Sequence, residues 1–585
     1  MSNIGKSKTP KTQILKRLMG YMLKYKLMVF LALLLMFSSN ILLLIGPKLS
    51  GYAIDAISLG KGNVDFQRVY HFCFLMIIFY TISSIMNYGL QRIMIKLSQN
   101  VSYKLRKDIF NSLSQLPVGY FDTHQTGDII SKISYDVDTV NETLCQDLLQ
   151  IATSMIGIIG SFIMMMTISP LLITVFIITI PISLSIATVM SKKVRPLFRK
   201  RSAKLGQLNG YMEEIISGQK TIKSYHQEET MQSRFEVKNN DAVEAHFDAD
   251  YMSSAIGPSM NFVNNLSMGL ISVLGSILYL KGLITIGNVS TFILYSRKFS
   301  GPINEISNIL SDLQSALSAA ERIFALIDEK PEVADIEGAK ELVNIKGEVK
   351  LENVKFGYTK EKEIIHNLSL EVKQGNLIAI VGHTGAGKTT IINLLMRFYD
   401  PNSGTISIDG NEIIGLTRKS LRLSYAMVLQ DTWLFNGTIF ENIAYGNEQA
   451  TLEDVERVAK AANIHNYIMS LPDEYETQLN EDGMNISQGQ KQLITIARAM
   501  LLDAKMLILD EATSNVDTIT EMKIQKAMRE LMKDKTCFVI AHRLSTIKNA
   551  DTILVVENGD IIEQGKHDEL LNKGGVYANL YNSQF

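Results

Sequence analysis

The stretch Gly382-His383-Thr384-Gly385-Ala386-Gly387-Lys388-Thr389 decides how the second half of this 585-residue chain folds. It lies between an apolar run, residues 377–381, and a segment with helical patterning that starts at Thr390. Glycines in such a turn let several backbone N–H groups point at one anion, and the N-terminus of the next helix also favours negative charge. The pattern predicts a phosphate-binding loop in which Lys388 reaches the β- and γ-phosphates and the Thr389 hydroxyl faces Mg²⁺. We therefore expect the chain to bind a nucleoside triphosphate.

Length and composition narrow the class of protein. A chain of 585 residues is too long for one hydrophobic core, so two or more domains are expected. The net charge of -1 gives no electrostatic reason to expect a nucleic acid partner. The three cysteines, Cys73, Cys145 and Cys537, show neither metal-ligand spacing nor a paired framework, which is typical of a reducing environment.

Long apolar runs fill the first half of the chain. A helix crosses the hydrocarbon core of a bilayer in about 20 residues. By that measure the sequence predicts six membrane spans, at 27–46, 70–90, 148–168, 171–190, 258–280 and 284–308. The second and the last of these runs match the pattern of a membrane span least well.

Basic residues between the spans predict the orientation. One group, between the second and third spans, comprises Arg92, Lys96, Lys104, Arg106, Lys107 and Lys132. Another, between the fourth and fifth spans, comprises Lys192, Lys193, Arg195, Arg199, Lys200, Arg201 and Lys204. Because Lys and Arg are retained on the cytosolic side, both termini and both basic stretches are expected in the cytosol. The stretches have helical patterning, which predicts helices that continue beyond the bilayer.

Polar residues inside the spans admit two interpretations. Arg297 and Lys298 lie in the last span, where a charge at the bilayer centre costs about 2.5–3.5 kcal/mol. An architectural role is favoured over substrate contact, because long side chains can extend to a polar region. For Asn40, Asn87, Asn264 and Asn265, hydrogen bonding between helices is favoured over lining a pathway. The run 164–166, three methionines, is expected to face lipid rather than to bind a drug.

Two further predicted strands of the second half end on residues whose side chains could bind a nucleotide or take part in catalysis. Residues 349–358 alternate as a strand does and end at Tyr358, whose ring could stack on adenine or simply pack. Residues 506–511 form an apolar strand that ends in Asp510 and Glu511. In a P-loop fold the first carboxylate holds Mg²⁺ through water, and the second is placed to accept a proton from the attacking water.

A second anion-binding helix terminus follows from Ser487-Gln488-Gly489-Gln490. Ser487 is a natural N-cap for the helical run that follows it. One subunit has no evident need of two phosphate cradles. A dimer does, if each nucleotide is clamped between the P-loop of one chain and the serine motif of the other.

With these motifs in order, nearly the whole chain resembles the half-transporters of the ABC transporter family, type I exporter class. The resemblance implies a multi-domain membrane protein with an all-α six-helix transmembrane domain and an α/β P-loop ATPase domain. It implies a cytosolic segment at 1–26, a transmembrane domain at 27–320, a linker at 321–348 and a nucleotide-binding domain at 349–585. The segment 120–131 resembles the family's first cytosolic loop, and the segment 223–229 resembles its second coupling helix.

The resemblance also implies the role of each site residue. ATP would be bound by Tyr358, by Gly382 to Lys388, by Thr389 and Thr390, and by Gln430. Mg²⁺ would be held, partly through water, by Thr389, Gln430 and Asp510. Glu511, His542 and Lys388 would be catalytic. The family signature is matched by Ser487, Gln488, Gly489 and Gln490, and its D-loop by Ser514, Asn515, Val516 and Asp517.

The signature departs from the family pattern at one residue. Gln488 stands where the family usually has glycine, and its bulk is expected to weaken the clamp on the partner's nucleotide. Lys388, Asp510, Glu511 and His542 are all present. This combination resembles the subunit of heterodimeric bacterial exporters that carries the catalytic glutamate. A heterodimer is therefore favoured, with a homodimer left open.

The resemblance implies an ATP hydrolase that moves a drug, lipid or peptide across the cytoplasmic membrane by alternating access. The expected partners are a second half-transporter, membrane lipid and a small-molecule or lipid substrate, with no nucleic acid. A homodimeric lipid flippase and an ATP-gated channel are the alternatives. The motifs leave the identity of the substrate open.

Overall fold

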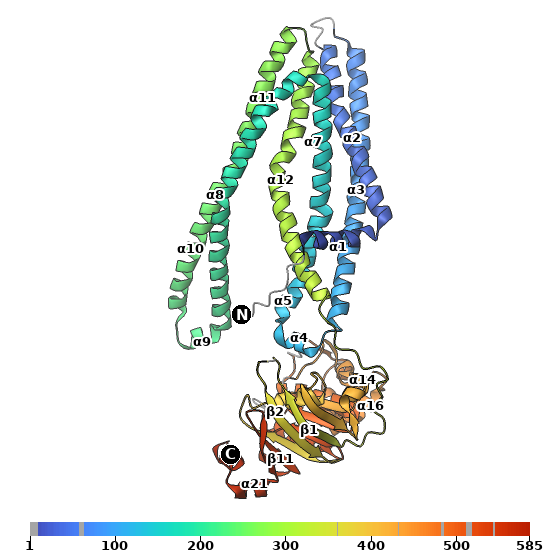
Figure 1. The fold of residues 1–585 in the computed structure, drawn as a ribbon, viewed down its shortest axis with the longest axis vertical. Helices are drawn as coiled ribbons and strands as arrows, with labels where there is room; N and C mark the ends of the chain where they lie inside the picture. Colours follow the sequence, from blue (N-terminus) through green and yellow to red (C-terminus); the bar gives the residue numbers. More distant parts are fainter. Residues whose placement is uncertain are drawn as a thin grey trace. The chain divides into compact units, whose positions relative to one another are not determined.

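The computed structural model describes residues 10–57, 64–359, 361–430, 432–480, 485–510, 517–541 and 544–584 (Figure 1). The chain forms two compact units. The first comprises Met1–Leu116 and His124–Lys330, and the second comprises Pro117–Thr123 and Pro331–Phe585. A short segment from the first half of the chain therefore belongs to the second unit.

The first unit is helical. Its long helices are α1 (Lys11–Leu23), α2 (Lys26–Ile57), α3 (Phe66–Leu113), α7 (Leu148–Ile168), α8 (Pro170–Ser217), α10 (Glu228–Ser254), α11 (Ile256–Leu280) and α12 (Ile286–Ile327). Shorter elements are α5 (Thr126–Ser131), α6 (Val137–Glu142), α9 (Gln219–Ser224) and two π-helical turns, η1 (Lys132–Asp136) and η2 (Thr143–Asp147). Asp65 caps α3 and Thr285 caps α12, each by accepting a backbone N–H three residues on.

Five stretches in the described part of the chain are long and apolar enough to cross a membrane. They are Lys26–Ile57, Phe66–Leu113, Thr126–Ile168, Pro170–Ser217 and Glu228–Leu280. The sixth predicted span, 284–308, falls in α12, which is not among them and so remains a prediction. Within α12, Lys298 Nζ donates to Leu43 O at 2.9 Å, and Arg297 Nε lies 3.3 Å from Met268 Sδ. These contacts with α2 and α11 agree with an architectural role for the two cations.

Aromatic and aliphatic side chains form a core among α7, α8, α11 and α12. Met165, Leu172, Ile271, Phe292 and Tyr295 are fully buried there. The expectation that residues 164–166 all face lipid is wrong for Met165. Successive residues of a helix point about 100° apart, so three in a row cannot share one face.

The second unit contains a six-stranded sheet in the order β12-β11-β3-β10-β9-β6, in which only β12 is antiparallel to its neighbour. Its strands are β3 (Leu377–Val381), β6 (Tyr425–Val428), β9 (Met506–Asp510), β10 (Thr536–Ile540), β11 (Thr552–Glu557) and β12 (Asp560–Gly565). An antiparallel sheet has the order β2-β1-β4-β5, with β1 (Val349–Phe356), β2 (Ile365–Val372), β4 (Ser403–Ile408) and β5 (Asn411–Glu412). The strands β7 (Gly437–Thr438) and β8 (Gln478–Leu479) pair separately.

Helices occupy the connections of this unit. They are α4 (Val118–Thr123), α13 (Lys388–Leu395), α14 (Arg418–Leu423), α15 (Ile439–Ala444), α16 (Leu452–Ala461), α17 (His465–Ile468), α18 (Gln488–Leu502), α19 (Thr518–Met532), α20 (Leu544–Lys548), α21 (His567–Lys573) and α22 (Val576–Gln584). Two 3-10 turns, η3 (Ile413–Gly415) and η4 (Glu474–Glu476), complete it.

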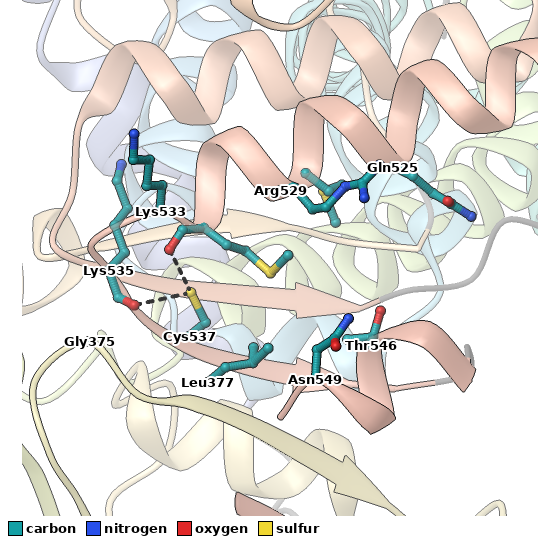
Figure 2. A pocket seen from close by; sticks show the side chains of 11 residues that line it. Gly375, Leu377, Gln525, Arg529, Lys533, Lys535, Cys537, Thr546 and Asn549 are labelled. Carbon is teal, nitrogen blue, oxygen red and sulfur yellow. Dashed lines mark hydrogen bonds between the residues drawn. The ribbon is translucent and has the colours of Figure 1, made fainter. Parts of the chain in front are cut away.

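A hollow of about 390 Å³ lies where β3 and β10 begin (Figure 2). Arg529 from α19, Asn549 and Cys537 are among the residues that line it. The Cys537 thiol donates to the carbonyl oxygens of Met532 and Lys535. The hollow is therefore at the edge of the sheet where the parallel strands start, opposite the edge where they end.

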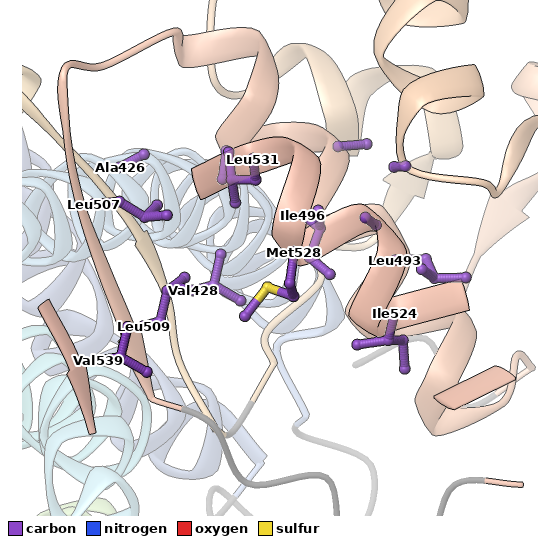
Figure 3. Packing of buried hydrophobic residues seen from close by; sticks show 14 of the residues in the cluster. Ala426, Val428, Leu493, Ile496, Leu507, Leu509, Ile524, Met528, Leu531 and Val539 are labelled. Carbon is purple, nitrogen blue, oxygen red and sulfur yellow. The ribbon is translucent and has the colours of Figure 1, made fainter. Parts of the chain in front are cut away.

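The six-stranded sheet is covered on both faces. Alternate residues of a strand point to opposite faces, and accordingly Leu507 and Leu509 pack in one cluster while Ile508 packs in the other. Figure 3 shows the first cluster, in which Ile496 of α18 and Met528 of α19 lie against this face. Burial on both faces explains why β9, β10 and β11 are almost wholly apolar.

Candidate nucleotide-binding site

The loop between β3 and α13 has a positive φ at each of its three glycines, and at two of them an added Cβ would also meet neighbouring atoms. Gly382 has φ +154°, and a Cβ there would lie 2.2 Å from Val556 O of β11. Gly387 has φ +106°, caps α13 and leaves a Cβ 3.1 Å from the Ile365 side chain. The loop thus wraps the N-terminus of α13 closely, with Gly385 in open space. Such a loop presents backbone N–H groups to an anion, which fits a nucleotide phosphate.

Lys388 crosses the inside of this loop. Its Nζ donates to Gly382 O at 2.8 Å and to His383 O at 3.0 Å. Burial lowers the pKa of Lys388, while the negative charge of Asp510 opposes that effect. In the described part of the chain, the hydrogen-bond partners of this partly desolvated ammonium are two neutral carbonyl oxygens, and phosphate oxygens would be stronger partners for it.

The remaining predicted loop residues are distributed on both sides of the backbone. His383, Thr384 and Thr389 are exposed, whereas Ala386 and Thr390 are buried. Thr390 Oγ1 lies 3.3 Å from Tyr358 Oη, so the loop helix also positions the predicted adenine-stacking ring.

The ring of Tyr358 is supported at its edges and exposed. Phe356 and Tyr399 meet it at close to a right angle, each with ring centroids 5.0 Å away. Asn393 Nδ2 donates to Tyr358 Oη at 3.2 Å. A base could stack on the exposed ring, as the sequence predicts, and Asn393 and Tyr399 are supporting residues that sequence reasoning missed.

Tyr399 connects this ring to the segment Pro117–Thr123, which belongs to the same unit. Tyr399 Oη donates to Asp122 Oδ2 at 2.5 Å. A Cβ at Gly119 would lie 2.9 Å from Tyr399 Cε1, so the segment packs directly on the ring. Burial and the Asp122 carboxylate raise the pKa of Tyr399. Asp122 lies in the segment that resembles the family's first cytosolic loop, but the sequence carried no signal for its partner.

Three of the predicted residues follow parallel strands at one edge of the six-stranded sheet. Gly382 follows β3, Gln430 comes two residues after β6, and Asp510 ends β9. Ligands of parallel α/β sheets bind at this edge. Gln430 is exposed there, while the influence of Asp510 on Lys388 indicates that those two charges are near each other. Thr389, Gln430 and Asp510 provide oxygen ligands of the kind that Mg²⁺ takes.

Several predicted residues lie outside the described part of the chain, and their roles stay predictions. They are Glu511, Ser514, Asn515, Val516 and His542. Asp517, the last residue of the predicted D-loop, caps α19 by accepting from the backbone N–H groups of Ile519 and Thr520. These hydrogen bonds lower the pKa of Asp517.

The serine motif begins α18 as predicted. Ser487 and Gln490 form a reciprocal capping box, and Gly489 is buried. Gln488 does not simply project from the helix terminus, because its Nε2 donates to Thr432 Oγ1 at 3.3 Å. The residue that departs from the family pattern therefore contacts the loop that contains Gln430.

Comparisons with known proteins agree with this geometry. A family model described as the ABC transporter transmembrane region matches residues 29–303, and one described as ABC transporter matches residues 365–514. An uncharacterized ABC transporter ATP-binding protein of Bacillus subtilis, YfiC, is 42% identical over 98% of this chain and 94% of that protein. A fatty acid ABC transporter ATP-binding/permease protein of Mycobacterium bovis is 42% identical over 89% of this chain and 82% of that protein. The solved structure of a bacterial Atm1-family ABC exporter with ATP bound has a TM-score of 0.76, with 30% identity, and the match covers 96% of this chain and 98% of that one.

Proposed function

The chain belongs to the ABC transporter family, and from that membership we propose that it is one subunit of an exporter for hydrophobic or amphipathic substrates in the cytoplasmic membrane. Its ATP-binding domain couples ATP hydrolysis to transport, and ABC exporters work as dimers. We place both termini and the ends of α8 and α10 that meet at α9 in the cytosol, because of their basic residues. The matches cover 94% of the Bacillus subtilis relative and 98% of the solved Atm1-family ABC exporter.

The observation that carries this proposal is the phosphate loop around Lys388. On binding ATP, the Lys388 ammonium would exchange the carbonyl oxygens of Gly382 and His383 for phosphate oxygens. Tyr358 would hold the adenine by stacking. Mg²⁺, when bound near Thr389, Gln430 and Asp510, would offset the negative charge of the phosphates.

Hydrolysis would depend on Glu511 and His542. We assign Glu511 to orient the attacking water and accept its proton, and His542 to help hold the γ-phosphate. Two chains would enclose two ATP molecules, each between one P-loop and the other chain's serine motif. That closure would reach the membrane helices through the segments 117–123 and 219–229 and turn the cavity outward. Hydrolysis would then reset the dimer.

We propose that the second chain is a different half-transporter. Gln488 adds a side chain to the helix terminus that would face the partner's nucleotide, while this chain keeps its own predicted catalytic residues. Its hydrogen bond to Thr432 also fixes a group beside that terminus, where a glycine would leave backbone alone. The partner would supply an unaltered signature over the ATP held by Lys388.

A single substitution tests the catalytic assignment. The variant Glu511→Gln should bind ATP as the parent does and lose most of its turnover. Hydrolysis at close to the parental rate would refute the assignment. Both quantities are measured on the complex reconstituted in nanodiscs.

The identity of the second chain is tested by comparing export by this chain alone with export by this chain together with a partner half-transporter. Purified alone, this chain should export little, and adding the partner half-transporter should restore export in vesicles. Full activity of the single chain would instead support a homodimeric lipid flippase. Ion conductance without solute accumulation would indicate an ATP-gated channel.

A further inference from the structure

A cavity of about 620 Å³ opens in the first unit between α2, α3 and the segment formed by η2 and α7. Side chains without charge line it throughout, as judged from the lining residues that the structure describes. Its polar lining is dominated by carboxamides, and the rest includes Leu43, Leu90 and Leu149. The six carboxamides are Asn40, Asn87, Gln91, Gln99, Gln146 and Gln150.

Hydrogen bonds of two lining residues, Ser39 and Ser98, tie α3 to α2 and to α6. Ser83 Oγ of α3 donates to Ser39 O of α2 at 3.0 Å. Ser98 of α3 and Asn141 of α6 exchange hydrogen bonds of 2.9 and 2.7 Å. These bonds fix the spacing of the helices, so the opening between them is part of the packed structure.

Most of the carboxamides have no partner among the residues that the structure describes. The exception on α2 is Asn40, whose Nδ2 donates to Met36 O of its own helix at 2.8 Å rather than to a neighbouring helix. The side chains of Asn87, Gln91, Gln99 and Gln146 make no hydrogen bond to a described residue. All four are exposed, so their amide groups are open to hydrogen bonds from water or from a ligand that enters the cavity.

A π-helical turn places one wall of the cavity. Thr143–Asp147 forms η2, and its residues Cys145 and Gln146 line the opening. Such turns are rare and occur frequently at functional sites, because the wider turn redirects side chains. The irregularity is thus located where it brings Gln146 toward Gln91 and Gln99 of α3.

The cavity extends past the end of a predicted span. Asn40 and Asn87 lie within the predicted spans 27–46 and 70–90, whereas Gln91 and Gln99 follow the second span. The cavity therefore begins within the predicted apolar layer and ends beyond it, on the side away from the connection between α2 and α3.

We propose that this cavity binds an amphiphile with an uncharged head group rich in hydroxyl or amide groups, such as a glycosyl lipid. Carboxamides both donate and accept hydrogen bonds, which suits sugar hydroxyls. An anionic head group would instead need an Arg or Lys in the lining, because an unpaired ion is costly to desolvate. The proposal rests on the proposed function in that the bound amphiphile is the exporter's substrate.

The test uses the complete transporter in nanodiscs without nucleotide. The probes are photoreactive analogues of monoglucosyl diacylglycerol, phosphatidylglycerol and a fatty acid, with the same reactive group and acyl chain. Labelled peptides are mapped by mass spectrometry. The glucosyl probe should label the α3 and η2 peptides, and unlabelled glucosyl lipid should compete with it.

Variants identify the carboxamides as the ligands. The double variant Gln91→Ala/Gln146→Ala should weaken the glucosyl probe about tenfold, which corresponds to about 1.4 kcal/mol. Gln146→Lys should shift the preference toward phosphatidylglycerol. The matched control is Asn265→Ala, which removes an exposed carboxamide of α11 outside this lining and should label as the parent does. Because these residues belong to the helical unit, an unchanged melting temperature of each variant shows that this unit is folded.

Three results would overturn the proposal. They are equal labelling of these peptides by neutral and anionic probes, parental labelling of the double variant, and cross-links that join two subunits through the cavity in place of lipid. Labelling is measured without ATP. A failure of export would therefore leave the lipid site standing, and a failure of labelling would leave the exporter standing.

Discussion

The closest backbone approach in the phosphate loop gives a prediction whose size follows from the structure. In Gly382→Ala, the new Cβ would lie 2.2 Å from Val556 O, a contact that real Cβ atoms do not make below 3.0 Å. The loop must therefore move away from β11 by about 0.8 Å. Because the obstacle is backbone in a buried parallel strand, the loop rather than the strand is expected to move.

Two costs follow from this substitution. A non-glycine residue at positive φ costs about 1–2 kcal/mol, which should lower the free energy of unfolding. A shift of nearly 1 Å should also take at least one backbone N–H out of reach of a phosphate oxygen. A hydrogen bond to a charged group contributes about 1.5–3 kcal/mol, so ATP affinity should fall by about 10- to 150-fold.

The assay is fluorescence titration of the reconstituted transporter with a non-hydrolysable ATP analogue, and glycine variants provide its controls. Gly415→Ala meets no atom within 4 Å and has no positive φ, so it should bind as the parent does. Gly385→Ala has φ +84° but open space around it, so it should show strain without a collision. If Gly382→Ala bound within twofold of Gly415→Ala, the reasoning from the close approach would be refuted.

Other perturbations probe contacts outside the loop. Tyr399→Phe removes the hydrogen bond to Asp122, which is worth about 1 kcal/mol, and should weaken ATP binding up to about fivefold. Additive effects of Tyr399→Phe and Asp122→Asn in a double-mutant cycle would show that the two groups do not interact. Arg322→Ala leaves the buried Asp136 carboxylate without its two hydrogen bonds of 2.6 and 2.9 Å. The free energy of unfolding should fall by about 2–3 kcal/mol, less than for a fully buried pair because the guanidinium is half exposed. An unchanged melting temperature would contradict this. Burial raises the pKa of Cys537 to about 12, so iodoacetamide at pH 8.5 should modify it far more slowly in the folded protein than in urea. The same shift stabilises the fold fully below the thiol's ordinary pKa of about 8.5, and that contribution should decline as the pH rises toward 12, as followed by urea unfolding.

Features that depend on neighbouring residues were predictable from the sequence. The positive φ values at Gly385 and Gly387 are a local requirement of the turn, and the glycines themselves mark it. The strand that ends at Asp510 is apolar because both of its faces are covered, and the sequence shows that directly. Ser487 caps its helix through a residue three positions away, which is also a local pattern.

Contacts between distant residues were not predictable. Tyr399 and Asp122 are 277 residues apart, and neither residue type specifies the other. Gln488 was noticed for its size, but its hydrogen bond to Thr432 depends on how two loops pack. The π-helical turn η2 has no sequence signature, so the convergence of carboxamides around it became visible only in three dimensions. The catalytic role of Glu511 stays a prediction, because the residue lies outside the described part of the chain.

The assignment of Pro117–Thr123 to the second unit limits how this protein can be dissected. A fragment that starts at Pro331 lacks the piece that covers Tyr399, so its aromatic surface would be open to water and to self-association. Exchange of the C-terminal domain between homologues faces the same difficulty. A single crossover point would take Tyr399 from one parent and α4, the helix that packs on it, from the other. A working chimera should therefore transplant both pieces from the same parent.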